Sequence, residues 1–132
     1  MLDDHPIADR LADDLIIWMT TVTASGNPQS SPVWFLREGE ELLVFSLDSA
    51  RVRNLTLNPR VALNLNSDRH GGHVTTMEGT ARVVDDAPPA DEHEVYVTKY
   101  FESMKSLGWT PADFASRYAT AIRITVDRIR AW

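Results

Sequence analysis

Hydrophobic and polar residues alternate along most of this chain, a pattern that predicts a protein built mainly from β-strands. The alternation predicts strands over residues 16–23, 29–37, 42–47, 61–66, 74–84 and 122–126. The turn clusters at residues 24–28 and 38–41 are short, so the first three strands should form an antiparallel meander. We therefore expect one mainly β domain, residues 1–132, folded as a six-stranded antiparallel barrel that is closed or nearly closed.

Helical periodicity interrupts this alternation in a few short segments. The pattern predicts helices over residues 7–14, 51–57, 90–107 and from 110 onward. In the third helix Val97, Phe101 and Met104 recur at helical spacing and should form its apolar face. In the last helix Thr110 and Pro111 occupy the N-cap and N1 positions that these residue types favour. A parallel α/β fold would need a helix after almost every strand, which this pattern does not provide.

The stretch from residue 45 to residue 59 predicts an anion-binding site. Arg51 and Arg53 follow the end of a strand and Ser49, a candidate N-cap. Backbone N–H groups at the start of a helix lack partners, and the helix dipole favours negative charge there. Guanidinium groups add bidentate recognition of phosphate. Together these features predict a phosphorylated small molecule as the ligand.

Composition excludes several other classes of protein. The net charge of −6 argues against general nucleic-acid binding, which needs a basic surface. The chain has no cysteine, which excludes disulfides, thiolate metal sites and a thiol nucleophile. No apolar run reaches about 18 residues, and the acidic N-terminus does not have the pattern of a signal peptide. We expect a cytoplasmic protein that binds neither membrane nor nucleic acid.

Two histidines three residues apart, His70 and His73, raise the question of a metal site. A metal site needs a third ligand and supporting hydrogen bonds, and no acidic partner is apparent nearby in the sequence. A flexible loop between two strands is the better interpretation, and no metal is expected. No nucleophile elbow or Ser-His-Asp spacing is present, so hydrolase chemistry has no support.

Several stretches of the chain resemble the flavin-binding split-barrel family, which contains pyridoxamine 5′-phosphate oxidase and the flavin/deazaflavin oxidoreductases. The stretches are residues 18–28, 31–36, 51–63, 79–83 and 122–132. The chain is most similar to the short actinobacterial branch that uses the deazaflavin coenzyme F-420. The resemblance implies a six-stranded split barrel that forms a homodimer, with two cofactors in grooves at the dimer interface.

The resemblance also implies a set of cofactor-binding residues. The expected set is Pro32, Val33, Trp34, Ser46, Ser49, Arg51, Arg53 and Asn54. Residues 32–34 match the strand whose backbone edge lies along the cofactor ring, Arg51 matches the phosphate ligand, and Ser46 matches a position that binds the phosphate or the ribityl arm. Ser49 could instead be only the N-cap of the helix. Arg53 could be a solvated side chain, and Asn54 could have a structural role inside the helix. Trp34 has the alternative of a core or dimer aromatic.

The expected function is that of an oxidoreductase, in which reduced F-420 delivers hydride to a small electron-poor acceptor. Where the family's oxidases carry an adjacent Arg-Lys pair, this chain has Ala50 and Arg51, and the C-terminal Arg/His substrate motif of those enzymes is absent. Both departures favour F-420 over FMN. No catalytic residue is assigned. The alternatives are an FMN enzyme, a non-catalytic flavin or F-420 carrier, and a heme-binding protein with His70 or His73 as axial ligand. Arg53 and Arg60 are candidates to hold the glutamate-bearing tail of F-420.

Overall fold

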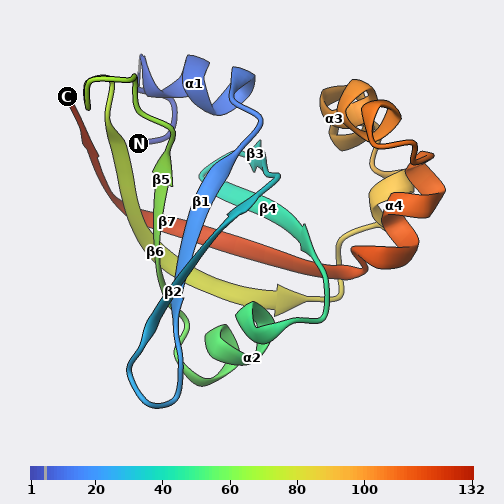
Figure 1. The fold of residues 1–132 in the computed structure, drawn as a ribbon, viewed down its shortest axis with the longest axis horizontal. Coiled ribbons are helices and arrows are strands. Elements are labelled where there is room, and N and C mark those ends of the chain that lie inside the picture. The colour runs from blue at the N-terminus through green and yellow to red at the C-terminus, as the bar shows by residue number, and fades with distance from the viewer. Residues whose placement is uncertain (5) are drawn as a thin grey trace.

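The computed structural model describes residues 1–4 and 6–132 and consists of one strongly curled antiparallel sheet with helices at its margins (Figure 1). The sheet has the strand order β2-β1-β5-β6-β7-β4-β3. Its strands are β1 (Ile17–Val22), β2 (Pro28–Val33), β3 (Leu36–Glu38), β4 (Glu41–Ser46), β5 (Arg60–Leu65), β6 (Thr75–Val84) and β7 (Thr120–Ala131). The expected mainly β fold of the split-barrel type is confirmed.

The strand count differs from the expected six because the predicted strand at residues 29–37 is divided in two. Strand β2 ends at Val33 and β3 begins at Leu36, and these strands form opposite edges of the sheet. Trp34 and Phe35 therefore carry the chain from one edge to the other, which holds the curled sheet nearly closed. The Tyr100 hydroxyl accepts a hydrogen bond from the Phe35 amide at 2.8 Å. A helix side chain thus satisfies a backbone group that would otherwise pair within a strand.

The helices lie at the margins of the sheet, with α1 at one end, α2 at the other, and α3 and α4 together at the side (Figure 1). Their bounds are α1 (Ile7–Asp13), α2 (Ala50–Leu57), α3 (Glu94–Ser106) and α4 (Pro111–Arg117), with a 3₁₀ turn at Ala90–Glu92 before α3. None of the described helices is long and apolar enough to cross a membrane. The start of α4 is as predicted, since Thr110 and Asp113 form a capping box and Pro111 is in its first turn.

The buried face of α3 differs from the predicted one. Tyr96, Tyr100 and Met104 are fully buried, whereas Phe101 is 45% exposed. The aromatic side chains of α3 pack against β3, β4 and α4 in a second apolar cluster beside the one inside the curled sheet. Tyrosine occupies these buried positions because its ring fills the cluster, although it scores as polar in the sequence pattern. The second cluster attaches α3 and α4 to the sheet and shapes the cavity described below.

A β-bulge in the pairing of β6 with β7 reverses the orientation of the last residues of β7. Glu78 is opposite Arg128, but the next residue, Gly79, is opposite Val126, so Asp127 is the extra residue. A Cβ on Gly79 would lie 2.3 Å from the carbonyl oxygen of Thr125, which explains the glycine. Before the bulge Val126 is buried, and after it Ile129 packs against the core while Arg128 and Arg130 are exposed.

Candidate functional site

Arg51 is a half-buried cation whose hydrogen-bond partners are neutral. It lies in the first turn of α2 and donates from Nη1 to Ser46 Oγ at 3.0 Å and from Nη2 to Ser31 Oγ. Burial lowers the pKa of Arg51 below its ordinary value, while the nearby Tyr118 acts in the opposite direction. By contrast, five other arginines form ion pairs with carboxylates, namely Arg10, Arg37, Arg60, Arg82 and Arg123. A desolvated cation with neutral partners is a favourable place for an anionic ligand.

On one side of Arg51 is a polar hollow of about 260 Å³ at the start of α2. It is lined by Thr21, Gln29, Ser30, Ser31, Ser49 and Arg51. Ser49 is the N-cap residue of α2, but its side chain makes no capping hydrogen bond. Ser49 Oγ and Arg51 Nε are both buried without a partner among the described residues. Two unsatisfied donors at a helix start are suited to the oxygens of a phosphate group.

On the other side of Arg51 is an aromatic cavity of about 350 Å³. Its walls include Trp34, Phe45, Trp109, Phe114 and Tyr118, together with Pro32 and Val33. The predicted residues 32–34 and Arg51 therefore do line one cavity. Because Arg51 borders both the polar hollow and the aromatic cavity, the two spaces together suit a ligand with a flat apolar ring and an anionic group.

Stacked aromatic rings form part of the wall of the aromatic cavity. Trp34 stacks on Tyr100, with centroids 4.6 Å apart and planes 3° from parallel, and on Phe114 at 5.1 Å. Phe114 in turn stacks on Tyr118 at 4.5 Å. The four rings join the β2–β3 connection to α3 and to the end of α4 in one continuous stack. Trp34 thus combines the two roles considered for it, because it packs in the second cluster and also lines the cavity.

The remaining predicted residues have different surroundings. Ser46 is buried, donates to the Leu47 carbonyl at 2.7 Å and accepts from Arg51. Asn54 is buried and donates to Thr21 Oγ1 at 3.0 Å and to Gln29 Oε1 at 2.9 Å, so it connects α2 to β1 and β2. Asn54 therefore positions Thr21 and Gln29, which line the hollow. Arg53 is exposed on α2 and lines neither cavity.

Arg60, a candidate to bind the cofactor tail, already forms an ion pair with Asp127. Its guanidinium donates to Asp127 Oδ2 at 2.6 Å and to Thr80 Oγ1 at 3.1 Å. This ion pair raises the pKa of Arg60 and lowers that of Asp127. Arg60 thus connects β5 to β6 and β7 on the sheet surface.

His70, His73 and His93 lie away from both cavities. His70 and His73 belong to the loop between β5 and β6, where Asp68 accepts hydrogen bonds from the amides of His70 and Gly72. His93 Nε2 is 3.1 Å from a Glu38 carboxylate oxygen, and its Nδ1 accepts from the Tyr96 amide as the cap of α3. Within residues 1–4 and 6–132, no three His, Asp or Glu side chains form a group that would hold a metal ion.

Three further residues belong to the site although the sequence does not predict them there. Ser31 contributes a hydroxyl partner to Arg51, while Trp109 and Tyr118 form part of the aromatic wall. Trp109 also packs against the rings of Phe114 and Tyr118. Of the other tryptophans, Trp18 is half-buried, with its Nε1 2.8 Å from Asn66 Oδ1, and Trp132 is 70% exposed. No local pattern marks Tyr118, since only the docking of α4 brings it near Arg51.

Comparison with known proteins agrees with this architecture. Residues 4–132 match the model of the pyridoxamine 5′-phosphate oxidase family, so the chain belongs to that family. The resemblance to the flavin split-barrel family is thereby confirmed. The search among curated proteins gives no match.

The solved structures with this fold include proteins named for different cofactors. An F-420 reductase shares 24% identity with a TM-score of 0.67, covering 92% of this chain and 94% of that one. The heme storage protein HutZ from Vibrio cholerae shares 18% identity with a TM-score of 0.66, covering 95% and 91%. An FAD-binding protein from Mesorhizobium loti shares 15% identity with a TM-score of 0.64, covering 92% and 88%. At these identities the likeness shows a shared fold.

Proposed function

We propose that this chain is an oxidoreductase that binds coenzyme F-420 and transfers hydride from it to a small electron-poor acceptor. The observation that carries the proposal is the position of Arg51, a half-buried cation without an acidic partner at the junction of a polar hollow and an aromatic cavity. A phosphorylated tricyclic cofactor has the two chemical parts that these spaces favour. Membership of a family of redox enzymes supports the same class of activity.

The residues around Arg51 would divide the binding of the cofactor between them. Arg51, Ser49 and the first amides of α2 would hold the phosphate, with Ser31 and Ser46 fixing the guanidinium. Residues 32–34 would contact the ring, which stacking walls would keep in one plane and shield from water. When bound, reduced F-420 supplies the hydride, and the protein supplies orientation and electrostatics.

Among the residues that the structure describes, Tyr118 is the one best placed to supply a proton to the acceptor. Tyr118 is the one tyrosine that lines the aromatic cavity among the described residues, and it is near enough to Arg51 to oppose the lowering of that residue's pKa by burial. Hydride addition leaves negative charge on the acceptor, and a phenol O–H can neutralise that charge by proton transfer. Solvent then returns a proton to Tyr118 Oη.

Two features support F-420 over FMN. The phosphate hollow has a single basic side chain, Arg51, next to Ala50, where the family's classical oxidases carry two adjacent basic residues. One structural neighbour with 24% identity is an F-420 reductase. A heme role has less support, because His70, His73 and His93 all lie outside the aromatic cavity.

We further propose that the protein acts as a homodimer. The face formed by β2, β1 and β5 carries Pro32, Trp18 and Asn64 in one register row, and Trp18 is only half-buried there. A second copy covering this face would also close the edge of the site at β2, because Pro32 borders the aromatic cavity. Light scattering at micromolar concentration should give twice the chain mass, and a monomer mass would contradict the dimer.

Titration of the purified protein with F-420 and with FMN, read by quenching of tryptophan fluorescence, tests the cofactor assignment. We expect tighter binding of F-420. Tight FMN binding without affinity for F-420 would move the assignment to an FMN enzyme. Reduced F-420 is then offered with quinones, nitroaromatics and tetrapyrroles as acceptors, and its oxidation is followed by absorbance. Tight binding without oxidation by any acceptor would indicate a carrier.

A further inference from the structure

A further cavity, of about 400 Å³, lies where the ends of β4 and β6 and the start of β7 meet α4 and the 3₁₀ turn, at the end of the sheet nearest α4 in Figure 1. Five alanines and two prolines form most of its wall, and we call it the alanine cavity. Phe45 and Tyr118 are its aromatic residues, and they also line the aromatic cavity at Arg51. Asp85 is the one charged residue among the described residues of this wall.

The register of the sheet explains why this space is open. Ala121 of β7 is opposite Phe45 of β4 and opposite Val84 of β6, and all three residues line the cavity. The methyl group of Ala121 leaves a hollow between its two larger neighbours. Pro88 and Pro89 stiffen the loop that borders this hollow, because their rings fix the backbone. The volume falls in the range of about 300–1,000 Å³ that is typical of small-molecule sites.

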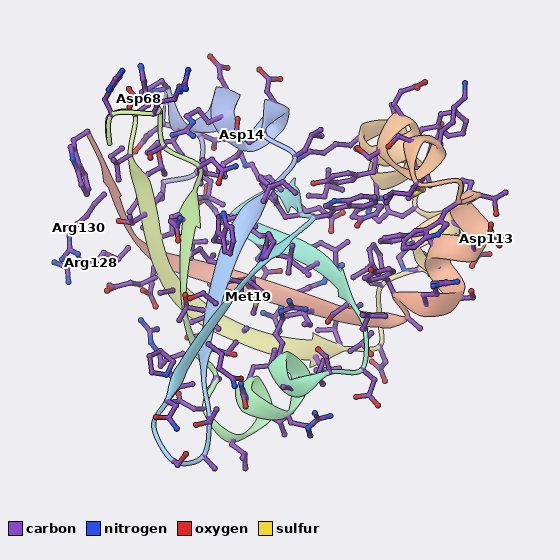
Figure 2. All side chains as sticks on the ribbon, viewed as in Figure 1. Asp14, Met19, Asp68, Asp113, Arg128 and Arg130 are labelled. Carbon is purple, nitrogen blue, oxygen red and sulfur yellow. The ribbon has the colours of Figure 1, made fainter. Side chains whose placement is uncertain are left out.

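Helix α4 contributes an apolar side chain to the alanine cavity and keeps its carboxylate elsewhere. Ala115 of α4 lines the cavity. Asp113, two residues earlier, accepts a hydrogen bond from the Thr110 amide at 2.9 Å. Figure 2 shows Asp113 on the side of α4 away from the sheet. The charge of the alanine cavity therefore comes from Asp85, without a contribution from α4.

Asp85 carries a negative charge that the described part of the chain does not pair. This residue is exposed, and its carboxylate has no hydrogen bond or ion pair within residues 1–4 and 6–132. The next carboxylate, that of Asp86, is 3.6 Å from Arg123 Nε. The guanidinium of Arg117 lies 5.1 Å from the ring centroid of Trp109. Neither arginine lines the alanine cavity, so Asp85 is left as an unneutralised anion at its wall.

These walls favour a ligand with an apolar body and a positive charge. The alanine and proline surfaces gain free energy when an apolar group replaces water against them. The rings of Phe45 and Tyr118 attract a cation through their quadrupoles, and Asp85 attracts it through its charge. The net charge of −6 on the whole chain also favours cations over anions.

We propose that the alanine cavity binds a small organic cation, with the apolar body of the ligand inside the cavity and its ammonium group at Asp85. The site is built from residues other than Arg51, so the inference does not depend on the proposed function. Because Phe45 and Tyr118 line both cavities, this second ligand lies directly behind the wall of the aromatic cavity.

Calorimetric titration of the full-length protein with three probes that share a phenethyl body tests the recognition of charge. The cation phenethylammonium should bind more tightly than the neutral phenethyl alcohol, and the anion hydrocinnamate should bind most weakly. Asp85→Asn should weaken binding of the cation about tenfold, the lower end of the range for charge-assisted contacts, and leave the alcohol unchanged. Asp86→Asn removes the neighbouring carboxylate, which does not line the cavity, and as the matched control should keep the advantage of the cation.

A second pair of variants tests the location of the bound probe. Ala115→Leu should fill part of the alanine cavity and weaken binding of the cation and the alcohol alike. Ala112→Leu, exposed on the same helix and outside the lining, is its control and should change neither. Ala115 does not line the aromatic cavity, so the loss assigns the probe to the alanine cavity. Thermal unfolding checks the fold of each variant, and Ala119→Leu, at an exposed position of the same wall, replaces Ala115→Leu if that variant does not fold.

The outcomes that contradict the proposal are distinct from those that contradict cofactor binding. Phenethylammonium that fails to bind at millimolar concentration, or that binds no more tightly than the alcohol, overturns the cation site. Full affinity of the cation for Asp85→Asn, or for the folded leucine variant, overturns it as well. None of these results changes the expected affinity for F-420, which depends on Arg51 and the polar hollow.

Discussion

Arg51 on α2 donates a hydrogen bond to the hydroxyl of Ser31 on β2, an edge strand of the sheet. The contact joins two segments that are 20 residues apart and places the guanidinium between the polar hollow and the aromatic cavity. Both hydroxyl partners of Arg51 are neutral, so the cation is oriented without being neutralised. An arginine in this state serves recognition more than stability, because its burial is unfavourable until an anion arrives.

Replacement of Arg51 by alanine should therefore weaken cofactor binding without unfolding the protein. The expected loss is about 1.5–3 kcal/mol of binding free energy, the range for hydrogen bonds to charged groups. Arg51→Lys should recover only part, because an ammonium group lacks the planar fork that contacts two hydroxyls and a phosphate together. Binding isotherms measure the loss, and thermal unfolding without ligand checks the fold. Unchanged cofactor affinity in Arg51→Ala would remove this residue from the site.

Tyr118→Phe should reduce turnover with little effect on cofactor binding. The phenyl ring can still stack on Phe114, whereas the proton on the phenol oxygen is lost. Loss of a general acid typically lowers the rate about 10²-fold or more. Stopped-flow oxidation of reduced F-420 with a saturating acceptor, together with its pH profile, measures the effect. An unchanged rate and profile would assign the proton to solvent instead.

Asn54→Ala should destabilise the protein. Its amide donates to both Thr21 and Gln29, and Thr21 is buried, so the substitution leaves acceptors without donors. The free energy of unfolding should fall by about 1–3 kcal/mol, as measured by urea denaturation. Arg53→Ala, one position earlier and exposed, is the matched control and should change stability by less than about 0.5 kcal/mol. Equal stability of the two variants would show that Asn54 does not hold α2 to the sheet.

Lys99 should make stability depend on pH in the alkaline range. Its Nζ donates to the carbonyls of Phe35 at 3.0 Å and Leu11 at 3.2 Å, and burial lowers its pKa to about 8. Between about pH 8 and the unfolded pKa of about 10.4, the unfolded chain binds more protons than the native state, so the contribution of Lys99 to stability rises with pH. The native protein should gain on the order of 1 kcal/mol over Lys99→Met between pH 7.5 and 10. Other titratable groups, such as Tyr96, are present in both proteins, so their contributions cancel in the difference between the two free energies of unfolding. A decrease of this difference between pH 7.5 and 10 would contradict the prediction.

Most of the strands and one half of the site can be predicted from the amino-acid sequence alone. Period-two alternation identifies strands wherever one face is buried, and the turn chemistry between strands is local. Ser46, Ser49 and Arg51 lie within six residues, so a strand end followed by a helix start already brings them together. The motif at residues 32–34 could be connected to them only through the family resemblance, since no local pattern joins it to Arg51.

The remaining relationships depend on contacts between segments that are distant in the sequence, so they emerge only in the folded protein. Trp34 and Phe35 divide a predicted continuous strand since the curled sheet brings its two edges together, and a hydroxyl from α3 replaces the lost backbone partner. Tyr118 enters the site through the docking of α4 on an aromatic cluster, which no short-range pattern encodes. The bulge opposite Gly79 inverts the alternation of β7, so that Arg128 and Arg130 face outward where a strict period of two from Val126 would have buried them.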